Sequence, residues 1–262
     1  VVSRDLGRTW EAPAQLTSFL GLGGILVGPG VGLQLRQSGR LLYCGHQNPN
    51  SFVWASDDHG ASWRVTAVFP FFNECQLTET PDGTVVINSR NQYHASGAGP
   101  ALFNQSARII ARSSDKGETF GARALSGDFL TVGAPDPALP EGSPTQGSVL
   151  SVGAHMFYSH PNGGHVRKNM SVWRSQDSGH TFKPSDIFRV DPGFSGYSCL
   201  SRLPPIVGDD VVGLLYERGG VDGCEDVACR IDFTLVPFIK TDDPSSYDYS
   251  VSFDSPSKRG AR

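Results

Sequence analysis

One short turn pattern occurs four times in the chain and constrains its fold more than any other feature. The pattern is Ser-x-Asp-x-Gly-x-Thr/Ser-aromatic, and consecutive copies begin 53, 57 and 62 residues apart. Repetition at a period of about 50 residues is typical of β-propellers, in which each period is one four-stranded blade. The copies are Ser3–Trp10, Ser56–Trp63, Ser113–Phe120 and Ser175–Phe182.

Each position of the pattern has a role in closing a hairpin. The Asp carboxylate and the Ser hydroxyl accept hydrogen bonds from N–H groups of their own turn, and the Gly permits a positive φ. We expect the aromatic ring to fold under the turn and become buried. Because turn geometry accounts for every position, we interpret the aspartates as structural and the variable His59 and His180 as solvated. The four aspartates are Asp5, Asp58, Asp115 and Asp177.

Strand-like runs fill the intervals between the copies, at about four per interval, and predict an all-β propeller. We assign residues 1–241 to this domain. Residues 242–262 are rich in Ser, Asp and Pro, and we predict a partly disordered tail. The runs are 40–44, 51–55, 84–88, 107–112, 149–152, 170–174, 211–216 and 231–236.

The composition agrees with short strands and many tight turns, since the 262 residues include 31 Gly and 18 Pro and only 18% are charged. A formal net charge of −4 gives no indication of a nucleic-acid partner. No apolar run is long enough to span a bilayer. The histidines and cysteines lack the spacing of a metal site, and no cofactor is indicated.

The chain contains five cysteines, an odd number that cannot all pair with one another in disulfides. Cys44, Cys75 and Cys199 lie in or beside strand-like runs and are expected to be buried thiols. Cys224 and Cys229 are close enough for a local disulfide, but two reduced thiols at a hairpin end fit equally well.

Two sequons, at Asn104 and Asn169, are a weak indication of a glycoprotein in a lysosomal or extracellular compartment. The chain opens on Val1 without an initiator Met, and we interpret its N-terminus as truncated.

The four repeats resemble the Asp boxes of the sialidase (neuraminidase) superfamily, which also occur in propellers that are not sialidases. Six segments, one of which contains the second repeat, resemble the lysosomal-type animal sialidases from the start of the chain to about Gly219. The similarity is loose at 121–146 and after 220. These segments are Leu41–His46, Ser56–Arg64, Asn73–Gln76, Pro81–Asn91, Ser195–Ser198 and Leu215–Gly219.

The resemblance implies an exo-α-sialidase that acts on sialylated glycoconjugates with retention of configuration. Arg90 and Arg167 correspond to two members of an arginine triad, whose planar guanidinium groups suit a substrate carboxylate. Tyr197 corresponds to the nucleophile and Glu74 to the base that activates it. Glu217 corresponds to a residue that orients the first arginine of the triad, although exposure or a pair with Arg218 would also explain a carboxylate at that strand end.

The family's first arginine and its acid/base aspartate have no counterpart in the chain. The resemblance therefore implies a six-bladed propeller of which about four to five blades are present. We expect weak or no hydrolytic activity from these residues alone, since a general acid contributes about 10²–10⁴-fold. The open gap would need an N-terminal segment or a stabilising partner protein to cover it.

Two other functions remain open. One is a non-catalytic propeller that binds glycans or proteins. The other is a related glycosidase that acts on a different sugar acid.

Overall fold

The computed structural model describes residues 2–13, 24–70, 72–90, 108–121, 124–125, 145–163, 167–203, 211–219, 230–237 and 251–254. Within these ranges the regular structure consists of antiparallel strands and one single-turn 3₁₀ helix, η3 (Pro184–Asp186). The predicted all-β class is confirmed. No helix in the described part of the chain is long and apolar enough to cross a membrane.

The first sheet holds five short strands, of which β1 and β2 both pair with β3 and form one interrupted inner strand. The order then continues outward through β4 to β5. The strands are β1 (Leu26–Val27), β2 (Leu33–Gln34), β3 (Leu41–Gln47), β4 (Asn50–Ser56) and β5 (Arg64–Pro70).

The second sheet is a four-stranded meander in which each strand pairs with the next along the chain. Its strands are β6 (Cys75–Glu79), β7 (Val85–Ser89), β8 (Ile109–Ser113) and β9 (Ala124–Leu125).

The remaining seven strands form two further blades that share β13 (Ile187–Arg202). The first half of β13 pairs with β12 as an outer strand, and its second half pairs with β14 as an inner strand. The third blade also contains β10 (Ser148–Val152), β11 (His155–Pro161) and β12 (Lys168–Ser175). The fourth contains β14 (Val211–Arg218), β15 (Arg230–Pro237) and β16 (Val251–Asp254).

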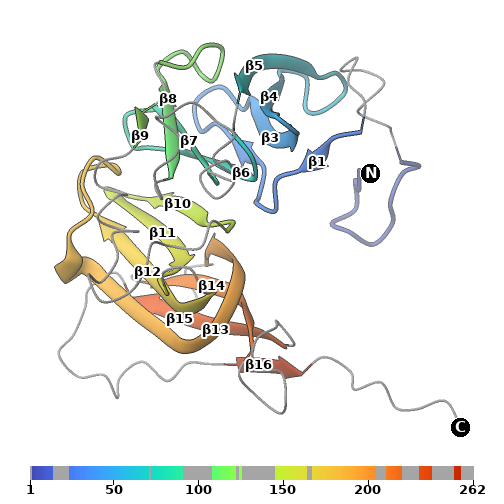
Figure 1. The fold of residues 1–262 in the computed structure, drawn as a ribbon. Helices are drawn as coiled ribbons and strands as arrows, with labels where there is room; N and C mark the ends of the chain where they lie inside the picture. Colours follow the sequence, from blue (N-terminus) through green and yellow to red (C-terminus); the bar gives the residue numbers. More distant parts are fainter. Residues whose placement is uncertain are drawn as a thin grey trace, which may run out of the picture.

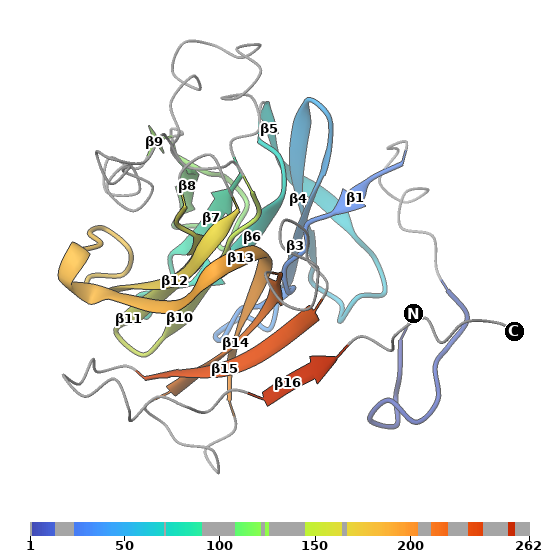
Figure 2. The same cartoon turned by 60° about the horizontal axis from the view of Figure 1, so that its bottom comes forward.

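The described residues therefore form four blades, which follow one another in an arc from β1 and β3–β5 through β6–β9 and β10–β12 to β14–β16 (Figures 1 and 2). The strand β16 lies within the predicted tail and pairs with β15. The last blade thus includes four residues beyond the predicted domain boundary at 241.

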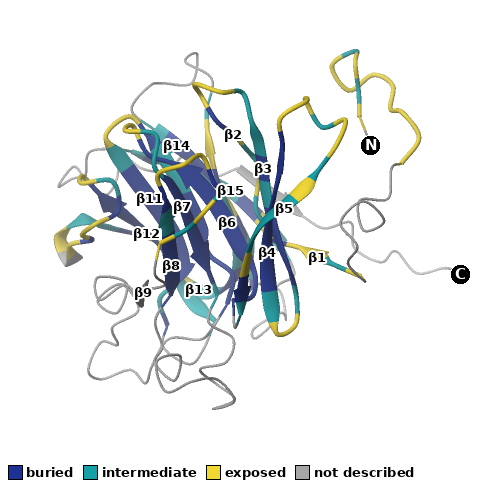
Figure 3. Ribbon diagram, turned by 90° about the horizontal axis from the view of Figure 1, so that it is seen from above, coloured by how far each residue is buried: buried dark blue, intermediate teal, exposed yellow. Residues whose placement is uncertain are grey.

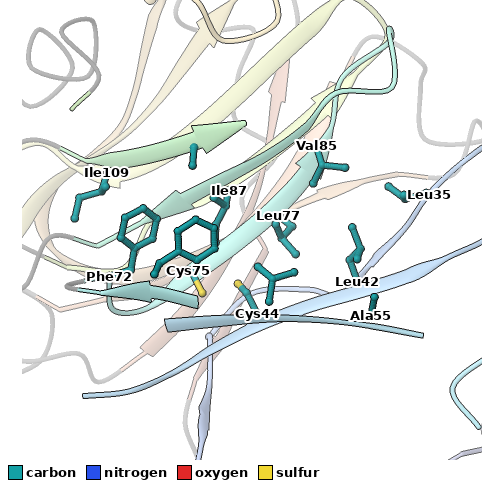
Figure 4. Packing of buried hydrophobic residues seen from close by; sticks show 13 residues of the cluster. Leu35, Leu42, Cys44, Ala55, Phe72, Cys75, Leu77, Val85, Ile87 and Ile109 are labelled. Atoms are coloured by element: carbon teal, nitrogen blue, oxygen red, sulfur yellow. The ribbon is translucent and has the colours of Figure 1, made fainter. Parts of the chain in front are cut away.

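Three apolar clusters lie between consecutive blades and join them. The first packs Leu42 and Val53 of β3 and β4 against Leu77 and Ile87 of β6 and β7 (Figure 4). The second joins the second and third blades, and the third joins the third and fourth. Buried residues accordingly concentrate on the strands, and exposed residues on the connecting turns (Figure 3). Burial of this apolar surface is the main favourable contribution to the fold.

The four boxes form the predicted turns. In each box the Gly has a φ between 78° and 90°, and the residue before it also has a positive φ. In the third box the Gly117 N–H donates to Oγ of Ser113 (2.8 Å), and the Thr119 N–H donates to Oδ1 of Asp115 (2.9 Å). The hydroxyl of Thr119, the largest influence, helps lower the pKa of Asp115 to about 2.

The aromatic residues of the boxes differ in burial. Phe182 is 3% exposed, Phe120 packs against the first core cluster, and Trp63 donates from Nε1 to O of Gly60 (3.1 Å). The expected burial is wrong for Trp10, which is 62% exposed. The first box precedes β1 and lies apart from the sheets (Figures 1 and 3).

Cys44 and Cys75 are free and buried, and their side chains lie in the same core cluster (Figure 4). Cys199 is free and half-buried, so its predicted burial is only partial. Cys224, Cys229 and the sequon at Asn104 lie outside the described residues. His59 and His180 are exposed, as predicted.

Candidate active site

The structure brings the five predicted site residues to one end of the sheets. Glu74 directly precedes β6, Arg90 directly follows β7, and Arg167 directly precedes β12. Tyr197 lies within β13 and Glu217 within β14. Strand ends from three blades therefore meet at this point.

The boxes lie at the other end of the same strands. Arg90 follows the end of β7, whereas the third box begins at Ser113, which pairs with the opposite end of β7 at Val85. Arg167 likewise precedes β12, whereas the fourth box begins at its last residue, Ser175. The boxes therefore contribute no group to the candidate site.

Glu74 accepts hydrogen bonds from two of the other predicted residues. The Tyr197 phenol donates to Oε1 of Glu74. Arg90 donates from Nη1 to Oε2 of Glu74 (2.7 Å), and this nitrogen also lies 3.5 Å from the phenol oxygen. The side chains of Arg90 and Glu74 are 15% and 10% exposed, so water screens their ion pair only weakly.

Arg167 contacts the same tyrosine from another side. Its guanidinium carbon lies 5.6 Å from the centroid of the Tyr197 ring, within the range of a cation–π contact. Its carbonyl oxygen accepts a hydrogen bond from the Ser195 N–H (2.9 Å), which ties the start of β12 to the segment that carries Tyr197. No carboxylate pairs with Arg167 among the described residues.

Glu217 holds the backbone of Tyr197, a contact that the sequence did not predict. Its Oε2 accepts a hydrogen bond from the Tyr197 N–H (2.9 Å). This approach requires glycine at position 196, because a Cβ there would lie 2.1 Å from Oε2. Arg218 pairs with other carboxylates, at 2.7 Å from Asp191 and 2.9 Å from Asp232. A Glu217–Arg218 pair is therefore not what fixes Glu217.

The pKa of the Tyr197 phenol is raised above its ordinary value near 10. Burial is the largest cause, followed by the hydrogen bond and the negative charge of Glu74. The positive charges of Arg90 and Arg167 oppose this shift. The phenol is therefore neutral in the resting protein and has a carboxylate in place to accept its proton.

Two further basic residues lie beside the site and were not predicted. Arg108 is 7% exposed and donates to Oδ1 of Asn88 (2.9 Å) and to O of Thr145 (2.7 Å), but its Nη2 has no hydrogen-bond partner in the described part of the chain. Burial, followed by the charge of Arg108, lowers the pKa of His160 to about 3. For Arg108 the only sequence signal was a charged residue within the predicted strand-like run 107–112, which does not show which way the side chain points.

Metal coordination does not account for the cluster. No group of three His, Cys, Asp or Glu side chains that could hold a metal ion exists among the described residues. The groups that meet here are a phenol, carboxylates and guanidinium ions, which suit proton transfer and the binding of an anion.

Comparison with known proteins agrees with the fold. The model of the protein family described as "BNR repeat-like domain" matches residues 1–253. A sialidase of Bacteroides fragilis (strain YCH46) is 28% identical over 238 residues, which cover 82% of this chain and 38% of that protein. Human sialidase-4 is 29% identical over 198 residues, which cover 59% of this chain and 39% of that protein. The chain thus spans less than two fifths of the length of these two curated relatives.

Among solved structures, the Hadza microbial sialidase Hz136 superposes with a TM-score of 0.66 at 23% identity. The match covers 90% of this chain and 42% of that one. At this identity the likeness concerns the fold, and it agrees with four blades of a larger propeller.

Proposed function

The chain belongs to the family of BNR repeat-like domains in the sialidase superfamily, and from this premise we propose that it carries the nucleophilic half of an exo-α-sialidase site. The observation that carries the proposal is the contact of Tyr197 with Glu74, Arg90 and Arg167. The enzyme would release terminal sialic acid from glycoconjugates with retention of configuration.

Arg90 and Arg167 would bind the substrate carboxylate. Arg90 uses Nη1 for Glu74, and its Nε has no hydrogen-bond partner among the described residues, so donors remain for a second anion. Arg167 has no carboxylate partner among the described residues, and its guanidinium group lies beside the Tyr197 ring. Planar guanidinium groups bind carboxylates through paired, charge-assisted hydrogen bonds. The buried charge of Arg108 would add to a local field that favours an anion.

Tyr197 would be the nucleophile. A carboxylate nucleophile would be repelled by the carboxylate on the anomeric carbon of a sialic acid, whereas a neutral phenol is not. A phenol with a raised pKa is a weak nucleophile until a base removes its proton. Oε1 of Glu74 already accepts a hydrogen bond from that phenol, so Glu74 would take the proton as the C–O bond forms.

The reaction would proceed in two displacements. Tyr197 Oη attacks the anomeric carbon, the bond to the leaving oxygen breaks, and that oxygen takes a proton from a general acid outside the described residues. Water then attacks the anomeric carbon and gives a proton to the conjugate base of that general acid, while Tyr197 leaves and Glu74 returns its proton to the Tyr197 oxygen. Two inversions at one carbon give net retention. Glu217 would fix the Tyr197 backbone, and its Oε1 would be available to orient a third arginine.

The test is turnover of a fluorogenic α-sialoside by the complete protein, with the anomer of the first product identified by NMR. Tyr197→Phe should lower kcat/KM by about 10³-fold or more, because the attacking oxygen is removed. Tyr43→Phe is the matched control, since the phenol of Tyr43 donates to O of Gly30 in the first blade and its ring packs on Trp54. Full turnover by Tyr197→Phe would refute the mechanism.

The same assay separates the alternatives. A non-catalytic glycan-binding propeller would bind the sialoside without turnover in any variant. A glycosidase for a different sugar acid would cleave the glycoside of that acid and leave the sialoside intact. We also propose a lysosomal or extracellular location, where the sequon at Asn169 could be glycosylated. A glycan on Asn169 would compete with the hydrogen bond that the Asn169 side chain donates to O of Asn162 (3.2 Å).

A further inference from the structure

Gln146 lies at the start of the inner strand of the third blade, two residues before β10. Its side chain is only 2% exposed. A buried carboxamide without partners is costly, so its hydrogen bonds indicate what it does. Both polar atoms of this side chain are bonded to the backbone of other blades.

The carboxamide of Gln146 binds both backbone groups of Ser198, the residue after Tyr197. Its Oε1 accepts from the Ser198 N–H (2.9 Å), and its Nε2 donates to the Ser198 carbonyl oxygen (2.9 Å). Nε2 also lies 3.3 Å from O of Pro29 in the first blade. A neighbouring strand would make the same pair of bonds to a residue in a sheet.

The segment around Tyr197 needs such a partner. The second half of β13 is the inner strand of the fourth blade, so it has a sheet neighbour, β14, on one side only. The register with β14 also shifts between Ser195 and Ser198. The Tyr197 N–H consequently bonds to the Glu217 side chain and not to a strand backbone.

We infer that Gln146 is a positioning residue, which takes the place of a strand neighbour on the inner side of β13 at one residue and holds Tyr197 in line with Glu74. The inference rests on the proposed function for its effect on catalysis, but the clamp itself is a property of the folded chain. Gln146 holds the Ser198 side of Tyr197, and Glu217 holds its amide. A shift of about 1 Å at a reacting atom can cost about 10²-fold in rate.

Gln76 offers a matched control. It is the same residue type, is 1% exposed, and also links two inner strands. Its Nε2 donates to O of Val149 (2.9 Å), and its Oε1 accepts from Oγ of Ser148 (2.9 Å). Ser148 in turn accepts from the Leu200 N–H, three residues beyond Tyr197. Gln76→Ala therefore removes a comparable buried link without releasing Ser198.

The first experiment measures amide hydrogen exchange in the complete protein and needs no substrate. In Gln146→Ala, the Ser198 and Tyr197 amides should exchange at least about tenfold faster than in the native protein, because two hydrogen bonds are lost. Gln76→Ala should leave these two amides within about threefold of native. Unchanged exchange in Gln146→Ala, or an equal effect in Gln76→Ala, would overturn the inference.

The second experiment uses sialoside turnover. Gln146→Ala should lower kcat by about 10²-fold with little change in KM, because the substrate carboxylate is held by arginines that do not contact Gln146. Gln146→Glu keeps the size of the side chain, and only its protonated form can both donate and accept. Its kcat should therefore recover as the pH is lowered, relative to native at each pH.

The two experiments separate the inference from the proposed function. If native protein does not turn over sialosides, the proposed function fails, and the exchange rates alone decide whether Gln146 clamps Ser198. If native protein is active and Gln146→Ala has native exchange and native kcat, the clamp is refuted and the sialidase assignment stands. If the kcat of Gln146→Glu relative to native protein did not change with pH, the clamp would also be contradicted, because a residue that only fills space would behave in this way.

Discussion

The phenol of Tyr197 donates a hydrogen bond to Oε1 of Glu74, although the two residues are 123 positions apart and come from the fourth and second blades. Arg90 bonds to the other oxygen of the same carboxylate at 2.7 Å. The proton acceptor is thus held by a cation on one side and faces the proton donor on the other. Together with burial, this three-residue arrangement influences the pKa of the phenol.

The titration of Tyr197 should respond to its two neighbours in opposite directions. Glu74→Gln should lower the pKa of Tyr197, because it removes the carboxylate charge that disfavours the phenolate. Arg90→Gln should raise that pKa, because it removes a charge that favours the phenolate. NMR of ¹³Cζ-labelled tyrosine, with Tyr197→Phe to assign the signal, measures both.

The raised pKa of Tyr197 also predicts how the stability of the fold depends on pH. The native pKa of Tyr197 is above the unfolded value of about 10. The contribution of the neutral phenol to the free energy of unfolding is therefore present below pH 10 and is lost as the pH rises through the native pKa.

In the titration experiment, pKa shifts of Tyr197 in the same direction for Glu74→Gln and Arg90→Gln would contradict the arrangement of the three side chains.

Gly196 should be intolerant of a side chain. A Cβ at this position would lie 2.1 Å from Oε2 of Glu217, so Gly196→Ala must displace the carboxylate that holds the Tyr197 N–H. We expect kcat/KM to fall by about 10²-fold. Gly121→Ala is the control, because its Cβ would meet only O of Arg112 at an ordinary 3.6 Å. Equal activity of the two variants would show that Glu217 does not position Tyr197.

The sequence predicted the features whose interactions are local. Each box closes through bonds between residues at most four positions apart, such as the 2.8 Å bond from the Thr181 N–H to Asp177, so its geometry can be read from the motif. The meeting of Tyr197 with Glu74 and Arg90 was predicted only by resemblance to a family, because composition and spacing do not bring together residues so far apart.

Residues with partners on other blades were missed. Gln146 and Arg108 bond to backbone atoms of Ser198 and Thr145, and these contacts exist only once the blades have packed. A backbone partner leaves no signal in residue types. The burial of Trp10 was wrongly predicted for a related reason, since a turn motif specifies the hairpin but not the sheet on which it packs.

The boxes should differ in their contribution to stability. Asp177→Ala removes the acceptor of bonds from Ser175, His180 and Thr181 in a box whose Phe182 is buried. We expect a loss of about 1–2 kcal/mol in the free energy of unfolding. Asp5→Ala should cost clearly less, because Trp10 of that box is exposed. Urea denaturation of both variants measures the difference, and equal losses would contradict it.

His160 should make the fold less stable in acid. Its ring is buried and stacks on Tyr158, and burial, followed by the positive charges of Arg108, Arg90 and Arg167, lowers its pKa to about 3 from an ordinary value of 6.5. Between these values the unfolded chain binds a proton that the native state does not bind. The stabilising contribution of neutral His160 is therefore complete above about pH 6.5 and is lost as the pH falls toward 3.

His160→Gln isolates this effect, because a carboxamide does not titrate. Relative to native protein, the variant should gain about 2–3 kcal/mol of stability between pH 7.5 and pH 4.5, whatever its absolute stability at pH 7.5. Urea denaturation at the two pH values measures the change. His59→Gln is the control, because that ring is exposed in the turn of the second box and folding does not remove it from water. Parallel stability curves for native protein and His160→Gln would mean that His160 takes up its proton without unfolding, and hence that its three arginine neighbours do not keep it neutral.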